Sequence, residues 1–194
     1  MLHPQARALL DLIAERGVPP THTLSPQEAR AVYRDRRGFT QPAPPPVASV
    51  QSLQAEGPLG PIPLRLYRPL GTMADQVLPA LVYYHGGGWV IGDLDTHDHL
   101  CRLICRDAAA HVLSVDYRLA PEHKAPAAVD DAYAAYLWAR EHAVELGEHG
   151  IDVADVPQRV AHRQHVGAVG GARGDAGFPQ TVEAATYQGA LAGK

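Results

Sequence analysis

The 194-residue chain has little cysteine, with only Cys101 and Cys105. They lie four positions apart, without the CxxC spacing of a zinc site, and two cysteines are too few for a secreted disulfide scaffold. Charged residues interrupt the apolar positions of residues 1–17, so this stretch does not read as a signal peptide. No apolar run is long enough to span a membrane. We therefore expect a cytoplasmic protein.

A strong net charge is also lacking. The 17 Lys and Arg and 21 Asp and Glu give a formal charge of −4, and the basic residues are scattered along the chain. Nucleic-acid binding normally requires a basic patch or stripe, so no nucleic-acid partner is expected. The glycine triplet at 86–88 does not extend to GxGxxG, and Gly193-Lys194 lacks the context of a phosphate loop. No cofactor is expected.

The hydrophobic content of 46% is that of an ordinary globular protein with one core. In residues 1–40, apolar spacing predicts a helix from Pro4 to Gly17. A second helix is expected to begin after Ser25 and to run to about Arg36, because proline follows Ser25 and Glu28 stands three positions on.

A sheet is predicted downstream of these helices. Val47 to Ala55 and Ile62 to Tyr67 alternate apolar and polar residues around a Gly-Pro turn, as expected of an antiparallel hairpin. Ala80 to Tyr84 and His111 to Asp116 read as buried strands. Helices are predicted over residues 98–110 and 127–142, so strand and helix alternate and the fold class is α/β with a mostly parallel sheet. The apolar face expected on the second of these helices consists of Val129, Tyr133, Tyr136 and Leu137.

The strongest local motif is His85-Gly86-Gly87-Gly88-Trp89, directly after a buried strand. Consecutive glycines allow backbone N–H groups to turn into a cleft, because no Cβ opposes positive φ or the close approach of a ligand. This is the construction of an oxyanion hole, and HGGG motifs occupy this place in esterases and lipases. A glycine-rich turn without a ligand is the alternative interpretation.

The segment HGGGWVIGDLDTHDHLCRLIC, followed by VLSVDYRLAPEHKAPAAVDDAYAAYLWA, resembles the hormone-sensitive-lipase-like carboxylesterases of the α/β-hydrolase superfamily. The resemblance covers roughly residues 1–161 and implies a small ester substrate. By this resemblance Gly87 and Gly88 donate N–H bonds to the oxyanion, Gly86 allows the turn, and His85 and Trp89 support the loop. It also implies a scaffold role for four residues, namely Asp116, Tyr117, Arg118 and Glu122.

The resemblance further implies a helical cap segment over residues 1–40 and a partial hydrolase core over 47–161, truncated after about the fifth strand. The family's nucleophile lies in a G-D-S-A-G-G elbow after a strand that here would begin with Arg159-Val160-Ala161. In straight register the serine position is Val166. A looser alignment reaches Gly174-Asp175-Ala176-Gly177, again without serine. All four serines precede the elbow, and the triad's acid and base would follow it. We therefore expect the catalytic triad to be absent and this chain to be inactive.

Alternative interpretations remain for the end of the chain, for its function and for one pair of histidines. The change of pattern after Ala161 suggests a frameshifted, non-functional fragment, with residues 162–194 as a divergent, disordered tail, and a genuinely truncated paralogue is the competing explanation. A non-catalytic binding module is the second alternative, and an open sheet edge would then favour self-association. His97 and His99 form an HxH pair, for which a solvated loop is favoured over a metal site. No metal is expected.

Overall fold

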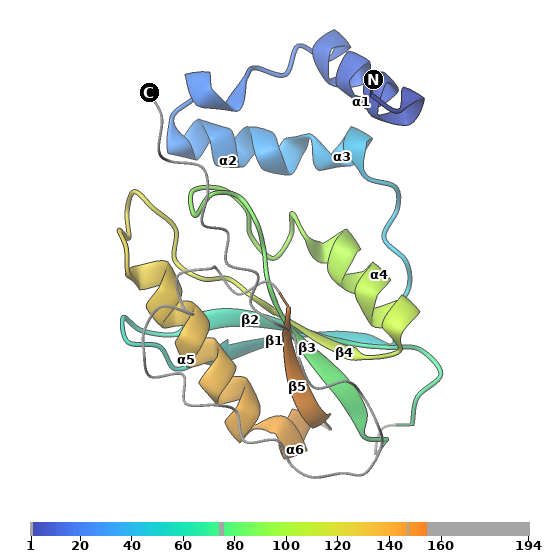
Figure 1. Ribbon diagram of the computed structural model, residues 1–194, viewed down its shortest axis with the longest axis vertical. Helices are drawn as coiled ribbons and strands as arrows, with labels where there is room; N and C mark the ends of the chain where they lie inside the picture. Colours follow the sequence, from blue (N-terminus) through green and yellow to red (C-terminus); the bar gives the residue numbers. More distant parts are fainter. Residues whose placement is uncertain (1, 74–75, 147, 155–194) are drawn as a thin grey trace, which may run out of the picture. The chain divides into compact units, whose positions relative to one another are not determined.

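The computed structural model describes residues 2–73, 76–146 and 148–154, all within one compact unit. Its N-terminal part is helical, with α1 at Pro4–Glu15, the short 3₁₀ helix η1 at Thr21–Thr23, α2 at Pro26–Asp35 and α3 at Arg37–Thr40 (Figure 1). The predicted capping box at α2 is confirmed, because Ser25 Oγ accepts from the Glu28 N–H and Glu28 Oε2 accepts from the Ser25 N–H. The short helix α3 was not predicted.

The remaining elements build a sheet with helices packed on it (Figure 1). Strands β1 and β2 form the predicted antiparallel hairpin, and β3 runs parallel to both β4 and β5. The strand order is β1-β2-β4-β3-β5, so β3 lies inside the sheet and the fold class is α/β. The bounds are β1 Ser49–Ala55, β2 Ile62–Arg68, β3 Leu78–Tyr84, α4 Asp98–Ala108, β4 His111–Val115, α5 Ala127–Glu141, α6 Ala143–Leu146 and β5 Glu148–Ala154.

Alternation along the strands sends their side chains to two cores, one on each face of the sheet. Val82 and Tyr84 of β3 join the cluster that packs against the alanines of α5. Tyr83, between them, joins the cluster that contains Cys101 and Cys105 of α4. Because a strand has a period of two residues, this register commits β3 to helices on both faces. The site loop therefore leaves a strand that is fixed on both sides.

The buried face of α5 differs from the one expected. Tyr133 is 42% exposed, and Val129, Tyr136 and Leu137 are only half-buried. The buried positions are small residues, which let the helix approach the sheet closely. Large apolar side chains at helical spacing were a misleading guide here, because the close contact selects alanine. The residues on the buried face are Ala128, Asp131, Ala132, Ala135 and Ala139.

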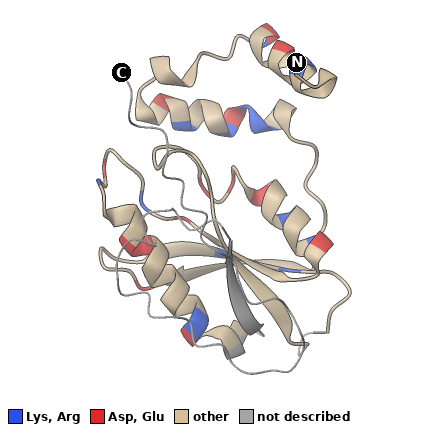
Figure 2. Ribbon diagram, viewed as in Figure 1, with Lys and Arg blue, Asp and Glu red and all other residues tan. Residues whose placement is uncertain are grey.

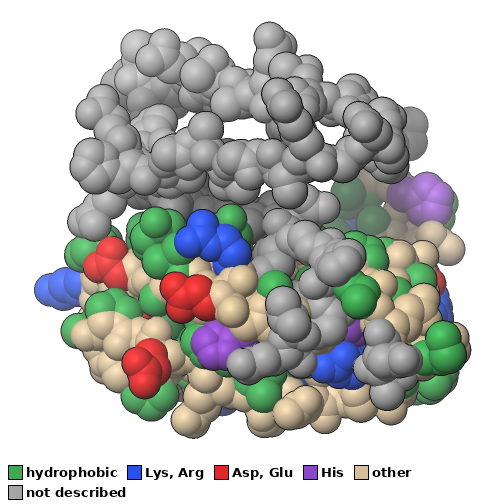
Figure 3. Space-filling view, turned by 90° about the horizontal axis from the view of Figure 1, so that it is seen from below, with side chains coloured by type: hydrophobic (Ala, Val, Ile, Leu, Met, Phe, Trp, Pro, Cys, Tyr) green, Lys and Arg blue, Asp and Glu red, His purple; other side chains and the backbone are tan. Residues whose placement is uncertain are grey.

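Strand β5 at Glu148–Ala154 was not predicted, because the sequence pattern favoured a strand at Arg159-Val160-Ala161. That stretch, the expected tail at 162–194, Val166 and the looser Gly174–Gly177 alignment all lie outside the described residues. Lys and Arg occur together with Asp and Glu on α2, α4 and α5 (Figure 2). The face seen in Figure 3 likewise mixes hydrophobic, charged and histidine side chains. Among the described residues, no helix is long and apolar enough to cross a membrane.

Candidate functional site: the glycine loop after β3

The loop that leaves the carboxyl end of β3 has an unusual backbone. Positive φ occurs at Gly87 (134°) and Gly88 (61°), and also at Trp89 (61°), although Trp89 carries a large side chain. A Cβ on Gly87 would lie 1.9 Å from the carbonyl oxygen of Ile91. Gly87 is therefore required both for its conformation and for the close approach of the chain four residues further on.

The turn that follows is closed by the carbonyl of Gly87, which accepts from the N–H groups of Val90 (3.2 Å) and Ile91 (3.1 Å). Within the described part of the chain, no hydrogen bond has the N–H of Gly87 or Gly88 as its donor. Backbone donors are normally satisfied, so two donors in one loop that lack an internal acceptor are available to a ligand or to water.

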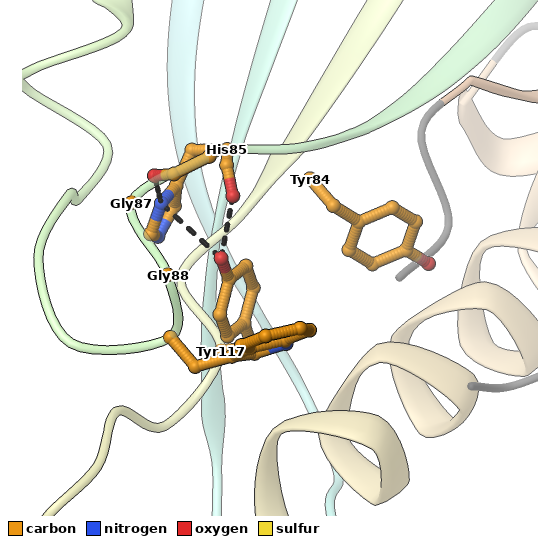
Figure 4. Close-up of a pocket in the computed structure, with 7 residues that line it drawn as sticks. Tyr84, His85, Gly87, Gly88 and Tyr117 are labelled. Carbon is orange, nitrogen blue, oxygen red and sulfur yellow. Dashed lines mark hydrogen bonds between the residues drawn. The ribbon is translucent and has the colours of Figure 1, made fainter. Parts of the chain in front are cut away.

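A pocket of about 140 Å³ lies against this loop. Its wall is formed by Tyr84 and His85 from the end of β3, by residues 86–89 and by Tyr117, which follows β4 (Figure 4). The Tyr84 hydroxyl donates to the carbonyl of Ala132 in α5 at 2.7 Å, which fixes that wall. Trp89 is 44% exposed at the pocket. The pocket combines apolar rings with backbone N–H groups, as small-ligand sites commonly do.

His85 is buried behind the loop and does not face solvent. The Tyr117 hydroxyl points at His85 and donates to its carbonyl oxygen, and the two rings stack with centroids 4.4 Å apart (Figure 4). The Nδ1 atom of His85 lies 2.9 Å from the carbonyl oxygen of Gly86. Because a carbonyl oxygen only accepts, Nδ1 carries the proton and donates it in this hydrogen bond. Burial lowers the pKa of His85, which keeps the ring neutral. These contacts fit a structural support of the loop.

His97 was expected in a solvated loop, and that interpretation is wrong. Its ring is half-buried and stacks on His85 with centroids 5.3 Å apart. Burial, followed by the neighbouring His85, lowers the pKa of His97. No sequence signal links residues twelve positions apart in this way, so the packing was not foreseeable. Among the described residues there is no group of three or more His, Cys, Asp or Glu that could hold a metal ion.

The segment after β4 holds the loop's surroundings by ion pairs. Arg118 Nη1 lies 2.6 Å from the Asp131 carboxylate, which is fully buried in α5 and also accepts from the Arg118 N–H. Glu122 pairs with Arg30 of α2 at 2.7 Å. Asp116 differs, because burial, followed by the nearby acidic residues of the 93–95 segment, raises its pKa to about 6.

Nucleophiles among the described residues are poorly suited to catalysis. Ser114 is fully buried in β4, away from the pocket wall. Burial raises the pKa of Cys101 to about 12 and that of Cys105 to about 11, so neither forms a thiolate near neutral pH. The pocket thus supplies donors for a negatively charged oxygen, and none of its described lining residues is a serine or cysteine.

Comparison with known proteins shows what this arrangement is similar to. A family model described as alpha/beta hydrolase fold matches residues 81–168, which include the glycine loop, α4, β4 and α5. Carboxylic ester hydrolase LipN of Mycobacterium tuberculosis is 58% identical over 120 residues, covering 62% of this chain and 30% of that protein. Ethyl acetate hydrolase of Pseudomonas putida is 37% identical over 154 residues, covering 75% and 48%.

Solved structures of ester hydrolases are also similar to this chain. An ester hydrolase from the metagenome of Lake Arreo, in complex with a derivative of bipyridine phosphonate, has a TM-score of 0.73 at 42% identity. That match covers 79% of this chain and 50% of the other. An esterase of Pyrobaculum calidifontis gives a TM-score of 0.71 at 39% identity, covering 78% and 48%.

The chain spans half or less of the length of each of these proteins. Within that span, both the sequence and the fold follow theirs. Over the matched residues the chain has the α/β-hydrolase fold, and there it is similar to the hormone-sensitive-lipase-like carboxylesterases.

Proposed function

We propose that this chain carries the oxyanion-binding loop of a carboxylic ester hydrolase. The N–H groups of Gly87 and Gly88 would donate to the carbonyl oxygen of a small ester, and His85 and Trp89 would support the loop. Gly86 would allow the start of the turn by family resemblance, although its φ is not positive and a Cβ there would meet no atom within 4 Å. The single observation that carries the proposal is that neither N–H has an acceptor among the described residues, beside a pocket of about 140 Å³.

Chemically, the loop matters because charge develops on that oxygen. When a nucleophile attacks an ester carbonyl, the oxygen becomes an oxyanion, and two fixed N–H donors stabilise it more than they stabilise the neutral ester. The relatives named as ester hydrolases support this assignment. The Lake Arreo enzyme is complexed with a derivative of bipyridine phosphonate, and the phosphorus of a phosphonate is tetrahedral, as is the carbon of such an intermediate. The substrate class we infer is therefore small carboxylic esters.

Turnover by this chain alone is not part of the proposal. With Val166 at the serine position and no serine after Ser114, the sequence offers no elbow nucleophile, so no acyl-enzyme can form. The division into a cap at 1–40, a partial core at 47–161 and a divergent tail at 162–194 belongs to the same proposal. The loop would bind the acyl oxygen without cleaving the ester.

A titration with butyrate tests the proposed loop. The butyrate carboxylate offers the loop a negatively charged oxygen in place of the carbonyl oxygen of an ester. The backbone amide resonances of Gly87 and Gly88 should therefore shift progressively as butyrate is added to a ¹⁵N-labelled sample. Gly17 and Gly71, which also have positive φ but do not line the pocket, should stay unchanged. Butanol, which lacks the charge, should leave all four resonances in place. Equal responses at all four glycines would overturn the proposal.

A non-catalytic interaction module is the second candidate, favoured by the position of β5. In the described sheet, β5 has one hydrogen-bonded neighbour, β3, and it ends the strand order. A strand edge offers backbone groups for pairing with another copy of the chain. If the chain is such a module, the Gly87 and Gly88 amide resonances would not respond to butyrate or to any other small carboxylate. The amide resonances of β5 would instead shift with protein concentration.

A further inference from the structure

Arg30 of α2 reaches the glycine loop from sixty residues away in the sequence. Its Nε donates to the carbonyl of Val90 at 2.7 Å, and its Nη2 donates to the carbonyl of Ala120 at 2.9 Å. On its other side the guanidinium binds both carboxylate oxygens of Glu122, at 2.8 and 2.7 Å. The Arg30 side chain is only 18% exposed. A planar, forked donor of this kind fixes the groups that it joins.

The acceptors of Arg30 enclose the strained residue of the loop. Trp89 has a φ of 61°. This backbone conformation is unfavourable in free energy for any residue that carries a side chain. The carbonyl of Trp89 accepts from the Ala120 N–H at 2.7 Å, and the carbonyl of Ala120 accepts from Arg30. The next carbonyl of the loop, that of Val90, also accepts from Arg30. Arg30 thus closes a ring of hydrogen bonds around the 89–90 segment.

The same helical segment contacts the loop further along. Arg34 pairs with Asp93, and Arg37 donates to the carbonyl of Asp95. Arg30, Arg34 and Arg37 therefore follow the loop from Val90 to Asp95 along one side of α2 and α3, since residues at this spacing share a helix face. Of the three arginines, Arg30 bonds the loop residue that is nearest in sequence to the glycines, Val90.

We propose that Arg30 is a positioning residue that holds Trp89 in its left-handed conformation and so sets the direction of the Gly87 and Gly88 N–H groups. The inference rests on the proposed function for its catalytic meaning. It assigns to the N-terminal helices a part in shaping the oxyanion loop, in addition to covering the core. Without Arg30, Trp89 relaxes toward negative φ and the two donors lose their fixed geometry.

The test uses the full chain with Trp138→Phe, which leaves Trp89 as the only tryptophan. In this background Arg30→Met removes all four bonds, Arg30→Lys keeps the charge without the fork, and Arg106→Gln is the control. Arg106 forms an exposed pair with its neighbour Asp107, so its loss matches the change in charge away from the loop. The readouts are hydrogen exchange of the 85–92 segment, Trp89 fluorescence quenching by acrylamide, and thermal unfolding.

Arg30→Met should speed amide exchange in the 85–92 segment about tenfold and change Trp89 quenching, while exchange in β3 stays as in the parent. Arg30→Lys should give a smaller change in the same direction, and Arg106→Gln none. Unchanged exchange in the loop would overturn the proposal, and so would an equal rise in β3, which would mean a merely structural role. If Arg30→Met does not fold, Arg30→Lys and Glu122→Gln decide by the same two criteria.

These measurements need no ligand. A loop that depends on Arg30 but whose glycine amides ignore butyrate would refute the oxyanion proposal and leave the positioning proposal standing. A loop that binds butyrate equally well with and without Arg30, at unchanged exchange, would do the reverse.

Discussion

Gly87 and Gly88 are neighbours with positive φ, yet their surroundings differ. A Cβ on Gly87 would collide with the backbone of Ile91, whereas nothing lies within 4 Å of a Cβ on Gly88. The first position is restricted by conformation and by space, the second by conformation alone. A pair of alanine substitutions therefore separates these two costs.

We expect Gly87→Ala to lower the free energy of unfolding by about 3 kcal/mol or more, because the backbone of Ile91 must move. Gly88→Ala should cost only about 1 to 2 kcal/mol, the price of a left-handed alanine. Urea denaturation followed by circular dichroism measures both. Equal losses for the two variants would show that the close approach at Gly87 does not restrict the loop.

Asp116 gives the stability of the chain a pH dependence of its own. Its pKa is raised to about 6 in the folded chain by burial, followed by the charges of Asp93 and Asp95, against an ordinary value of 3.8. Between these values the folded chain binds more protons than the unfolded chain. The contribution of Asp116 to stability is therefore fully present below pH 3.8 and is lost as the pH rises through 6.

Asp116→Asn should accordingly be more stable than the parent at pH 7, and this advantage should shrink as the pH falls from 6 toward 4. The comparison between the two proteins isolates Asp116, since His85 and His97 titrate in both. Unfolding midpoints in urea at four or five pH values give the difference curve. A difference that stays flat across this range would mean that Asp116 is not perturbed.

Sequence reasoning found part of the candidate site and missed the contacts behind it. The glycine triplet and its place after a buried strand identified the loop, because few other sequences allow such a backbone. Tyr117 and Glu122 were expected as scaffold by family resemblance, and both contact loop supports. The His85–His97 stack and the bonds of Arg30 were missed, since pairings over 12 and 60 residues leave no local pattern.

At the scale of elements, strongly periodic segments were predicted well and weak ones poorly. The hairpin, α4 and α5 lie where alternation or helical spacing indicated, and β3 and β4 lie where the sequence read as buried strands. β5 was missed because Glu148–Ala154 contains a glycine and only a short alternating run. The strand order was not predicted either, because it depends on how the crossovers pack and not on any one segment.

The orientation of α5 provides a test at this scale. Ala135 is fully buried against the sheet, so Ala135→Leu should overpack the core and cost about 1 to 3 kcal/mol. Tyr133→Ser, on the exposed side, should change stability by less than about 0.5 kcal/mol. Thermal unfolding of the two variants is the measurement. The opposite ranking would mean that the tyrosine face, as the sequence first suggested, packs on the sheet.

At the scale of the whole molecule, the chain combines a glycine loop typical of ester hydrolases with half or less of the length of its relatives. The described part holds the glycine loop on a strand fixed by α4 and α5, with α2 bonded to the same loop. We therefore propose that this chain retains one of two capacities that a complete esterase joins: it binds the acyl oxygen but does not attack the acyl carbon.

Intact-mass spectrometry after incubation with a fluorophosphonate tests this proposal most directly. The protein used is first shown to be folded by its cooperative unfolding. Such reagents modify a serine only when it is activated beside an oxyanion hole, so the reaction reports the nucleophile and the loop together. We expect the mass to stay that of the unmodified chain. One equivalent of phosphonylated serine in the folded protein, lost on denaturation before treatment, would contradict it and place a working nucleophile beside Gly87 and Gly88.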